Sequence, residues 1–264
     1  MSPHFVSLIA PAKLTLSLRV TGIRKDGFHL IDAEMVTLEL ADELTVDTSR
    51  TGLEITGKFA DDLASPTSAQ SATTQNATTS ANVNLVVRAL QLANRQAHIS
   101  ITKNIPSGGG LGGGSADAAA ILRWAGFTDL ASAAKLGADI AFCIVGGRAR
   151  VSGIGEVVNP LKKVAREITL VVPPFRVSTP AVYHAYDQLT DFCQTPLKHA
   201  GINDLEPAAI KVEPRLAIWK EKITHVCGVE PKLAGSGSTF WLDGNFTNLA
   251  TQLADATVIT TRTN

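Results

Sequence analysis

The sequence lacks the features that would place it in several large classes of protein. No apolar run approaches the ~20 residues that a membrane-spanning helix needs, and no basic segment precedes an apolar core at the N-terminus, as a signal peptide requires. The charges balance, with 24 basic and 24 acidic side chains, so nothing favours nucleic acid or an anionic membrane as the main partner. The three cysteines are scattered and fit neither a disulfide framework nor a zinc motif. We therefore expect a cytoplasmic protein that binds neither membranes nor nucleic acid.

What the chain has in abundance is glycine in one place. All but one of the residues from Gly108 to Gly114 are glycine, and the alanine-rich stretch Ser115–Trp124 follows at once. So much glycine costs backbone entropy, and a chain tolerates it where the backbone adopts positive φ or approaches a ligand closely. We expect a helix that begins at Ser115 and ends at Gly126. A glycine loop before a helix N-terminus presents free N–H groups and the positive end of the helix dipole, which predicts a phosphate site.

Two common phosphate loops fit this stretch poorly. The P-loop needs Gly-Lys-Ser/Thr at the start of the helix, and no lysine stands between Lys103 and Lys135. A G-x-G-x-x-G pattern does occur at Gly108, Gly110 and Gly113, but a run of glycines matches it by accident. A dinucleotide-binding fold also needs the pattern directly after an early strand, and here a proline interrupts the approach. We therefore expect a phosphate loop of another kind.

The rest of the chain reads as strands and helices with one low-complexity segment. Strands are expected at 5–10 and 12–20 (separated by Pro11), 33–40, 42–47, 98–101, 148–151, 168–172 and 239–242, and helices after Asn84 and Ser178, at 130–136, after Asn203 and at 249–254. Residues Ser65–Asn82 are mostly Ser, Thr, Ala, Asn and Gln, which predicts a mobile surface loop. A chain of 264 residues is long enough for two modest domains, and we place them at 1–160 and 161–264.

Several segments together resemble the GHMP kinase superfamily, whose members phosphorylate galactose, homoserine, mevalonate and related alcohols. The closer resemblance is to its 4-diphosphocytidyl-2-C-methyl-D-erythritol kinase family, and it rests on APAKLTLSLRVTGIRKDGFH, IPSGGGLGGGSADAA, LGADIAFCIVGG, STPAVY, NDLEPAA and LAGSGSTF. It implies a two-domain α+β fold, with an N-terminal ribosomal-S5-like domain, a C-terminal ferredoxin-like domain and the substrate in the cleft between them. It also implies that ATP, carrying Mg2+, gives its γ-phosphoryl group to the 2-hydroxyl of the cytidine-bearing alcohol, in the non-mevalonate route to isoprenoid precursors.

The resemblance also assigns roles to individual residues. Lys13 and Asp139 become the catalytic pair, with Asp139 as general base, whereas the residues alone leave a helix cap at Asp139 equally open. The ATP-binding residues would be Pro106, Ser107, Gly108, Gly109, Gly110, Leu111, Gly112, Gly113, Gly114, Ser115, Ala116 and Lys103. The substrate-binding residues would be Thr15, Phe28, His29, Thr179, Tyr183, Gly235, Ser236 and Gly237. Among these, Phe28 and Tyr183 would sandwich the cytosine while His29 hydrogen-bonds its edge. The family usually has Asn in place of Thr15 and Tyr in place of Phe28, and no protein ligand of a metal is assigned.

Two other functions remain open at this point. Another GHMP kinase, acting on homoserine or a mevalonate derivative, would keep the glycine loop without needing an aromatic pair for a base. A non-catalytic nucleotide-binding module of the same fold would not need Lys13 and Asp139, and their presence argues against it. For the kinase we expect ATP and a small molecule with a cytidine diphosphate group as partners, and either a monomer or a homodimer.

Overall fold

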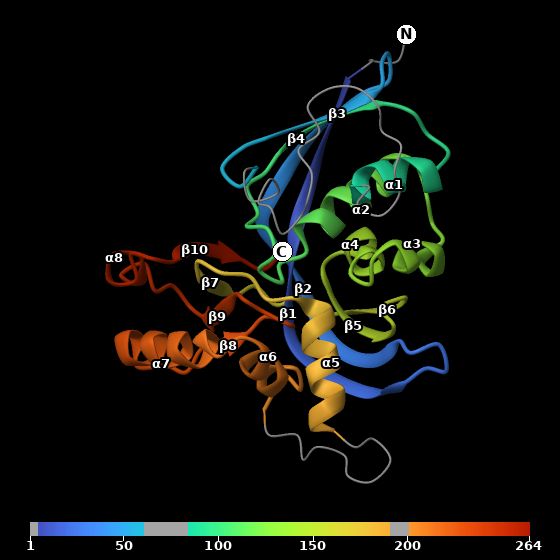
Figure 1. Ribbon diagram of the computed structural model, residues 1–264. Coiled ribbons are helices and arrows are strands. Elements are labelled where there is room, and N and C mark those ends of the chain that lie inside the picture. The colour runs from blue at the N-terminus through green and yellow to red at the C-terminus, as the bar shows by residue number, and fades with distance from the viewer. Residues whose placement is uncertain (1–4, 61–83, 191–200) are drawn as a thin grey trace.

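The computed structural model describes residues 5–60, 84–190 and 201–264, and the predicted Ser65–Asn82 loop lies outside them. Two β-sheets form the framework (Figure 1). The first contains β1 (Phe5–Ile23), β2 (His29–Asp47), β3 (Gly52–Thr56), β4 (His98–Thr102), β5 (Arg148–Gly153) and β6 (Val157–Leu161), in the order β3-β4-β2-β5-β6 with β1 paired to β2. The second contains β7 (Glu167–Val172), β8 (Lys232–Leu233), β9 (Phe240–Asp243) and β10 (Thr257–Arg262), in the order β10-β7-β9-β8.

The helices also fall into two groups. The helices α1 (Leu85–Leu92), α2 (Gly113–Trp124), α3 (Leu130–Leu136) and α4 (Ile140–Val145) gather beside the first sheet (Figure 1). The helices α5 (Thr179–Leu189), α6 (Glu206–Val212), α7 (Arg215–Cys227) and α8 (Leu249–Gln252) come later in the chain, among the strands of the second sheet. Among the residues that the structure describes, no helix has the length and apolar character needed to cross a membrane.

The strands β1 and β2 form a long antiparallel pair through the centre of the molecule (Figure 1). The expected breaks at Pro11 and at Ala41 are wrong, because each strand continues through them. Proline has no N–H to donate and is tolerated in a sheet where the pairing is irregular. The register shifts between Pro11 and Lys13, and the Lys13 N–H donates instead to the Leu111 carbonyl at 3.0 Å. The irregularity at the proline thus joins β1 to the glycine loop.

Helix α2 follows the glycine loop, but it begins at Gly113 rather than at Ser115. Gly112 occupies the N-cap position with a left-handed φ of 70°, so Ser115 lies within the first turn and is not the cap. The helix ends as expected before Gly126, which has a positive φ of 71°. Its buried alanines from Ala116 to Ala120 have short side chains, so the helix packs closely on β1 and α1.

A group of buried apolar side chains joins the two sheets at the glycine loop. It includes Leu14 and Val36 from the first sheet, Leu170 and Trp241 from the second, and Leu111 from the loop itself. Leu111 interrupts the run of glycines and is only 1% exposed. Because this side chain is buried between both sheets, the loop is fixed at their junction and does not behave as a linker.

Several elements were not expected from the sequence. The strands β3 and β6 lie at the edges of the first sheet, and their side chains are mostly exposed or half-buried, so they leave a weak hydrophobic pattern. Helix α7 did carry a signal, because Leu216, Trp219 and Ile223 are spaced for one helix face and are buried. The predicted helix starts at Asn84 and Ser178 are confirmed, since each side chain caps its helix.

Candidate active site

The glycine loop lies against a second glycine-rich segment that comes from the other half of the chain. A Cβ on Gly110 would stand 2.5 Å from the Ala234 carbonyl oxygen, and one on Gly109 would stand 2.5 Å from Thr239 Oγ1. The Thr239 N–H also donates to the Gly109 carbonyl at 3.1 Å. Part of the glycine content is therefore needed for this contact between chain segments, which leaves no room for a side chain. The sequence interpretation had attributed the glycines to positive φ, which Gly108, Gly110 and Gly112 do show, or to a close approach of a ligand, and did not include this contact.

The predicted catalytic residues Lys13 and Asp139 are brought together beside this loop. Lys13 Nζ lies 3.2 Å from Asp139 Oδ2, and the two side chains are 7% and 29% exposed. A Cβ on Gly112 would stand 2.8 Å from Lys13 Cγ, so the start of α2 lies directly on the lysine stem. The pair therefore combines a buried ammonium with a carboxylate that solvent or a substrate can still reach.

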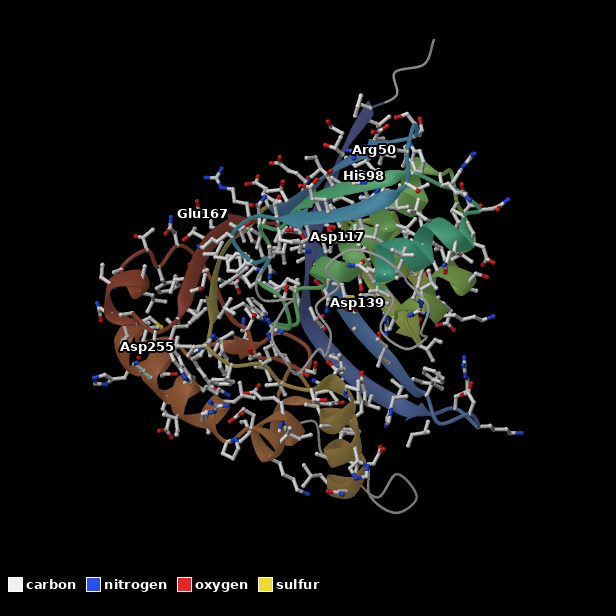
Figure 2. All side chains as sticks on the ribbon, turned by 45° about the horizontal axis from the view of Figure 1, so that its top comes forward. Arg50, His98, Asp117, Asp139, Glu167 and Asp255 are labelled. Atoms are coloured by element: carbon white, nitrogen blue, oxygen red, sulfur yellow. The ribbon has the colours of Figure 1, made fainter. Side chains whose placement is uncertain are left out.

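The helix-cap interpretation of Asp139 does not hold. Asp139 is the residue before α4, yet its side chain makes no capping hydrogen bond. The aspartate at the equivalent position before α3 behaves differently. Asp129 accepts a hydrogen bond from the Ser132 N–H at 3.1 Å and so caps that helix. The Asp139 carboxylate is directed to Lys13 instead, and Figure 2 shows it near the middle of the molecule.

A group of aromatic side chains lies where α5 approaches the turn between β1 and β2. The His29 ring lies against the Tyr183 ring, with centroids 4.6 Å apart and planes tilted by 34°, and its Nε2 is 2.6 Å from Asp187 Oδ1. Burial, together with the nearby Asp139 charge, raises the pKa of Tyr183. Phe28 is 56% exposed and lies beneath the Arg24 guanidinium at 5.4 Å. The ring stacked on Tyr183 is therefore that of His29, and the sandwich of a cytosine between Phe28 and Tyr183 stays a prediction.

The predicted turn Gly235-Ser236-Gly237 lies close to Thr15 and Lys13. A Cβ on Gly235 would stand 3.8 Å from Thr15 Oγ1 and 4.0 Å from Lys13 Nζ. Asn203 Nδ2 donates to the Gly235 carbonyl at 2.7 Å, and the hydroxyls of Thr179 and Ser236 are 2.7 Å apart. The turn is thus held in place by α5 and by the segment before α6, above the Lys13 ammonium.

Comparison with known proteins decides the family. The family described as "GHMP kinases N terminal domain" matches residues 84–147. A 4-diphosphocytidyl-2-C-methyl-D-erythritol kinase of Paracoccus denitrificans is 37% identical, over 87% of this chain and 84% of the relative. One of Ruegeria pomeroyi is 40% identical, over 89% and 87%. The chain belongs to the 4-diphosphocytidyl-2-C-methyl-D-erythritol kinase family.

Solved structures agree with this membership. A crystal structure of 4-(cytidine 5'-diphospho)-2C-methyl-D-erythritol kinase is 28% identical with a TM-score of 0.71, and the match covers 98% of this chain and 99% of that one. A homoserine kinase from Cytophaga hutchinsonii has a TM-score of 0.58 at 14% identity, over 100% and 96%, and this likeness shows the fold alone. The molecule therefore has the two-domain α+β fold of GHMP kinases.

The predicted substrate-binding residue Thr15 contacts the predicted catalytic lysine. Thr15 is 3% exposed. The Lys13 ammonium donates to its hydroxyl oxygen at 3.2 Å. The Thr15 hydroxyl thus holds the Lys13 ammonium directly by a hydrogen bond.

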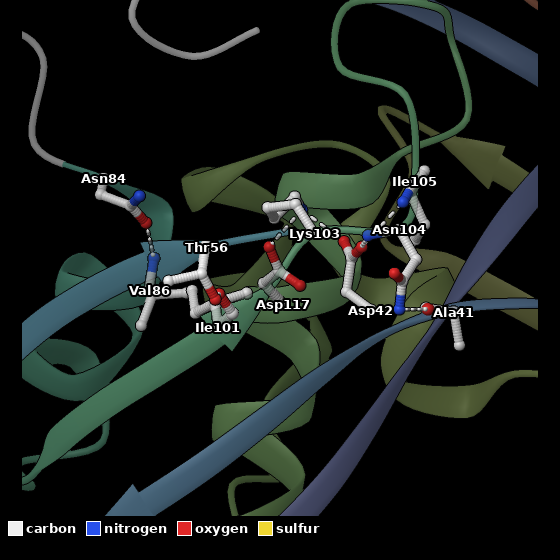
Figure 3. Close-up of polar contacts among 10 residues, drawn as sticks. All are labelled: Ala41, Asp42, Thr56, Asn84, Val86, Ile101, Lys103, Asn104, Ile105 and Asp117. Atoms are coloured by element: carbon white, nitrogen blue, oxygen red, sulfur yellow. Dashed lines mark hydrogen bonds and ion pairs between the residues drawn. The ribbon is translucent and has the colours of Figure 1, made fainter. Parts of the chain in front are cut away.

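Lys103, which the resemblance assigned to the ATP site, has a different environment from the predicted catalytic residue Lys13. Lys103 is 2% exposed, and its ammonium donates to Asp42 and to Asp117, the latter at 2.7 Å (Figure 3). The structure does not support direct contact of Lys103 with the nucleotide, because its charge is already compensated inside the protein. Gly113 lies directly over it, since a Cβ there would stand 3.3 Å from Lys103 Nζ.

The two carboxylates around Lys103 connect it to the glycine loop. Asp42 Oδ1 accepts from the N–H groups of Asn104 and Ile105, at 2.6 and 2.8 Å, where β4 leads into the loop (Figure 3). Asp117 lies on α2, and its burial raises its pKa to about 7 in spite of the opposing Lys103 charge. Its Oδ1 has no hydrogen-bond partner among the described residues. This buried cluster therefore holds both ends of the glycine loop.

Four polar residues of this kinase's site region were missed by sequence reasoning: Asp42, Asp117, Asp187 and Asn203. Asn203 and Asp117 lay inside segments that carried the resemblance, but nothing in their spacing distinguished them from solvated side chains. Asp187 did carry a local signal, because it stands four residues after Tyr183 and therefore on the same face of α5.

Proposed function

We propose that this chain catalyses transfer of the γ-phosphoryl group of ATP to the 2-hydroxyl of 4-diphosphocytidyl-2-C-methyl-D-erythritol, in the non-mevalonate synthesis of isoprenoid precursors. The observation that carries the proposal is the Lys13–Asp139 pair, 3.2 Å apart, directly beside a glycine loop at a helix N-terminus. A loop of this kind binds phosphate, and a carboxylate next to it can accept the proton of an alcohol. The family membership supplies the identity of that alcohol.

The chemical step needs only the groups named so far. The hydroxyl proton moves to the Asp139 carboxylate while the hydroxyl oxygen forms a bond to the γ-phosphorus. The bond from that phosphorus to the bridging oxygen breaks, and ADP leaves. The Lys13 ammonium lies beside the Asp139 carboxylate and stabilises negative charge on the reacting oxygens during the step. Mg2+ bound to the ATP phosphates is part of the nucleotide substrate and neutralises their charge.

The other predicted residues divide between the two substrates. The N–H groups from Ser107 to Ser115, in the loop and the first turn of α2, are proposed to hold the ATP phosphates. Pro106 has no N–H to offer, and the Ala116 N–H already donates to the Gly112 carbonyl at 2.8 Å, so these two residues shape the loop. Leu111 contributes backbone only, since its side chain is 1% exposed. Tyr183, His29 and the exposed Phe28 are proposed to bind the cytosine, with Phe28 closing on the base when it arrives. The turn Gly235-Ser236-Gly237 and Thr179 would face the diphosphate.

A coupled ADP-release assay tests the proposal against the alternative alcohols. The purified protein is given ATP with the cytidine compound, methylerythritol phosphate without its cytidine, homoserine or mevalonate. We expect rapid turnover with the cytidine compound alone, and phosphorus NMR of the product should place the new phosphate on the 2-hydroxyl. Faster turnover with homoserine or mevalonate would make this a GHMP kinase of another specificity. ATP binding without turnover on any alcohol would make it a non-catalytic module.

Three further predictions remain untested. The domain limits of 1–160 and 161–264 are supported by the change of sheet between Leu161 and Glu167. The cytoplasmic location fits a kinase that uses ATP and a small phosphorylated alcohol. The choice between monomer and homodimer stays open to a measurement of mass in solution.

A further inference from the structure

The His29 imidazole is held on several sides, and this constrains which of its nitrogens can face a substrate. Its ring lies against Tyr183, with centroids 4.6 Å apart, and meets the edge of Tyr186 at 6.4 Å. Its Nε2 is 2.6 Å from Asp187 Oδ1. Among the described residues this is the one hydrogen bond that the imidazole makes. Nδ1 is therefore the ring nitrogen left for a ligand.

The chemistry of the partner fixes the position of the proton. An ionised carboxylate accepts hydrogen bonds and cannot donate one, so at this distance the proton lies on Nε2 of His29. In a neutral imidazole the other nitrogen then carries a lone pair and acts as an acceptor. Asp187 stands on α5 and His29 at the start of β2, so the tautomer is set by a residue distant in the sequence.

We propose that Asp187 is a positioning residue that selects the pyrimidine base of the substrate by fixing His29 in the tautomer that has its proton on Nε2. Cytosine offers an exocyclic amino group as donor where a pyrimidine of the uracil type offers a carbonyl oxygen as acceptor. An acceptor at Nδ1 accepts a hydrogen bond from the amino group of cytosine. Against the carbonyl oxygen of a uracil-type base it would place two lone pairs face to face, which is unfavourable. This inference rests on the proposed function, since it assumes that the base binds beside Tyr183 and His29.

Removing the carboxylate should relax this selection. In Asp187→Ala nothing holds the proton on Nε2, so His29 can also place it on Nδ1 and donate to a carbonyl. A site with a matched hydrogen bond discriminates strongly against an analogue that leaves its polar groups unpaired, and the gain of one such bond changes affinity by about tenfold. We therefore expect the KM for the uridine analogue to fall about tenfold, while the KM for the cytidine substrate rises about twofold, by the share of His29 in the other tautomer, and kcat and the KM for ATP stay within about twofold.

The decisive experiment compares the cytidine substrate with its uridine analogue in the wild type, in Asp187→Ala and in Gln188→Ala. Gln188 is the next residue on α5 and contacts His184 at 3.0 Å on an exposed surface, so its removal is a matched control for the loss of a polar side chain on the same helix. The preference for cytidine should be strong in the wild type and in Gln188→Ala, and should fall at least about fivefold in Asp187→Ala. Nitrogen-15 NMR of labelled histidine, with His29→Asn for assignment, should show one tautomer in the wild type and a mixture in Asp187→Ala.

The outcomes separate the inference from the function on which it rests. An unchanged cytidine preference in a folded Asp187→Ala protein would overturn the role of Asp187, and so would a His29 signal that shows the proton on Nδ1 in the wild type. A wild type that phosphorylates neither nucleotide compound would instead overturn the proposed function. A fall in kcat for both bases, with the preference intact, would show that Asp187 only supports α5.

Discussion

Two buried lysines flank the start of helix α2, and their surroundings are opposite. Lys13 lies beside Gly112 and pairs with one carboxylate, Asp139, which is 29% exposed. Lys103 lies beside Gly113 and is enclosed by two carboxylates, Asp42 and Asp117, whose side chains are 0% and 5% exposed. In the first pair, which is open, the Asp139 carboxylate can still be reached by a substrate. In the second group, the closed cluster, the described residues bury the ammonium and both carboxylates, so a substrate cannot reach them.

This contrast indicates how a buried lysine that can take part in catalysis differs from one that only stabilises the fold. Burial alone lowers the pKa of Lys103, but the Asp117 and Asp42 charges outweigh it, and the pKa is raised. A cation held this firmly holds the loop in place and is not available to a ligand. At Lys13 a single carboxylate and the Thr15 hydroxyl leave the ammonium able to interact with further oxygens. The predictions below test this division, from the largest expected effect to the smallest.

Replacement of the open carboxylate should abolish most of the chemistry and leave the fold intact. We expect Asp139→Asn to lower kcat by about 10² to 10⁴, the usual scale for general-base catalysis, because the amide cannot accept the hydroxyl proton. Affinity for ATP should persist, since the glycine loop is unchanged. The matched control is Asp129→Asn, which alters the helix-capping aspartate of α3 and should leave kcat within about twofold, because Asn caps nearly as well. Equal kcat values for the two variants would remove Asp139 from the mechanism.

Replacement of the closed lysine should act on stability. Lys103→Met leaves Asp42 and Asp117 buried without a counter-charge, and breaking a buried pair in this way costs about 3–5 kcal/mol of unfolding free energy. Denaturant unfolding measures this directly. The comparison is Lys13→Met, which should destabilise less because Asp139 remains partly solvated. A larger loss of stability in Lys13→Met than in Lys103→Met would contradict the assignment of Lys103 to the structure and of Lys13 to the chemistry.

The difference between the lysines also shows where sequence reasoning stops. The glycine loop and its helix follow from composition, because few other structures need so many glycines. Lys13 and Asp139 were found only through resemblance to a family, since neither has a distinctive neighbour pattern. The enclosure of Lys103 could not be predicted because its partner Asp42 is 61 positions away, and His29 meets Asp187 across 158 positions. Contacts of that length leave no local periodicity, so a buried ion pair and a solvated one look alike in sequence.

A side chain on Gly112 should disturb the open pair selectively. Gly112→Val would place a branched side chain in left-handed backbone and against Lys13 Cγ, and left-handed backbone costs such residues about 1–2 kcal/mol. We expect about a tenfold lower kcat together with weaker ATP binding, since Lys13 and the loop N–H groups both move. Gly228→Val is the matched control, because Gly228 has a left-handed φ of 71° at the end of α7, outside the glycine loop, and its Cβ would meet nothing within 4 Å. Its stability should fall by a similar amount while its kinetics stay normal. Equal ATP affinities in Gly112→Val and the wild type would place the phosphates elsewhere.

The smallest expected effect is a pH dependence that belongs to the closed cluster alone. Burial raises the pKa of Asp117 to about 7, from 3.8 as the ordinary value. Between these two values the folded chain holds a proton that the unfolded chain has released, so this group's contribution to stability falls as pH rises. The physical reason is that two buried carboxylates share one ammonium, and one proton makes the cluster neutral. Asp117→Asn imitates that neutral state at every pH.

Unfolding curves at two pH values therefore isolate the cluster. Between about pH 6 and about pH 8, the wild type should lose about 1 kcal/mol relative to Asp117→Asn, which is the size expected when one shifted group titrates through this range. The matched control is Asp139→Asn, which removes the carboxylate of the open pair and should follow the wild-type pH curve with a constant offset. A wild type that stays parallel to Asp117→Asn across this range would mean that Asp117 remains ionised beside Lys103. The closed cluster would then carry a net negative charge under the glycine loop, which would repel the ATP phosphates that the loop is proposed to bind.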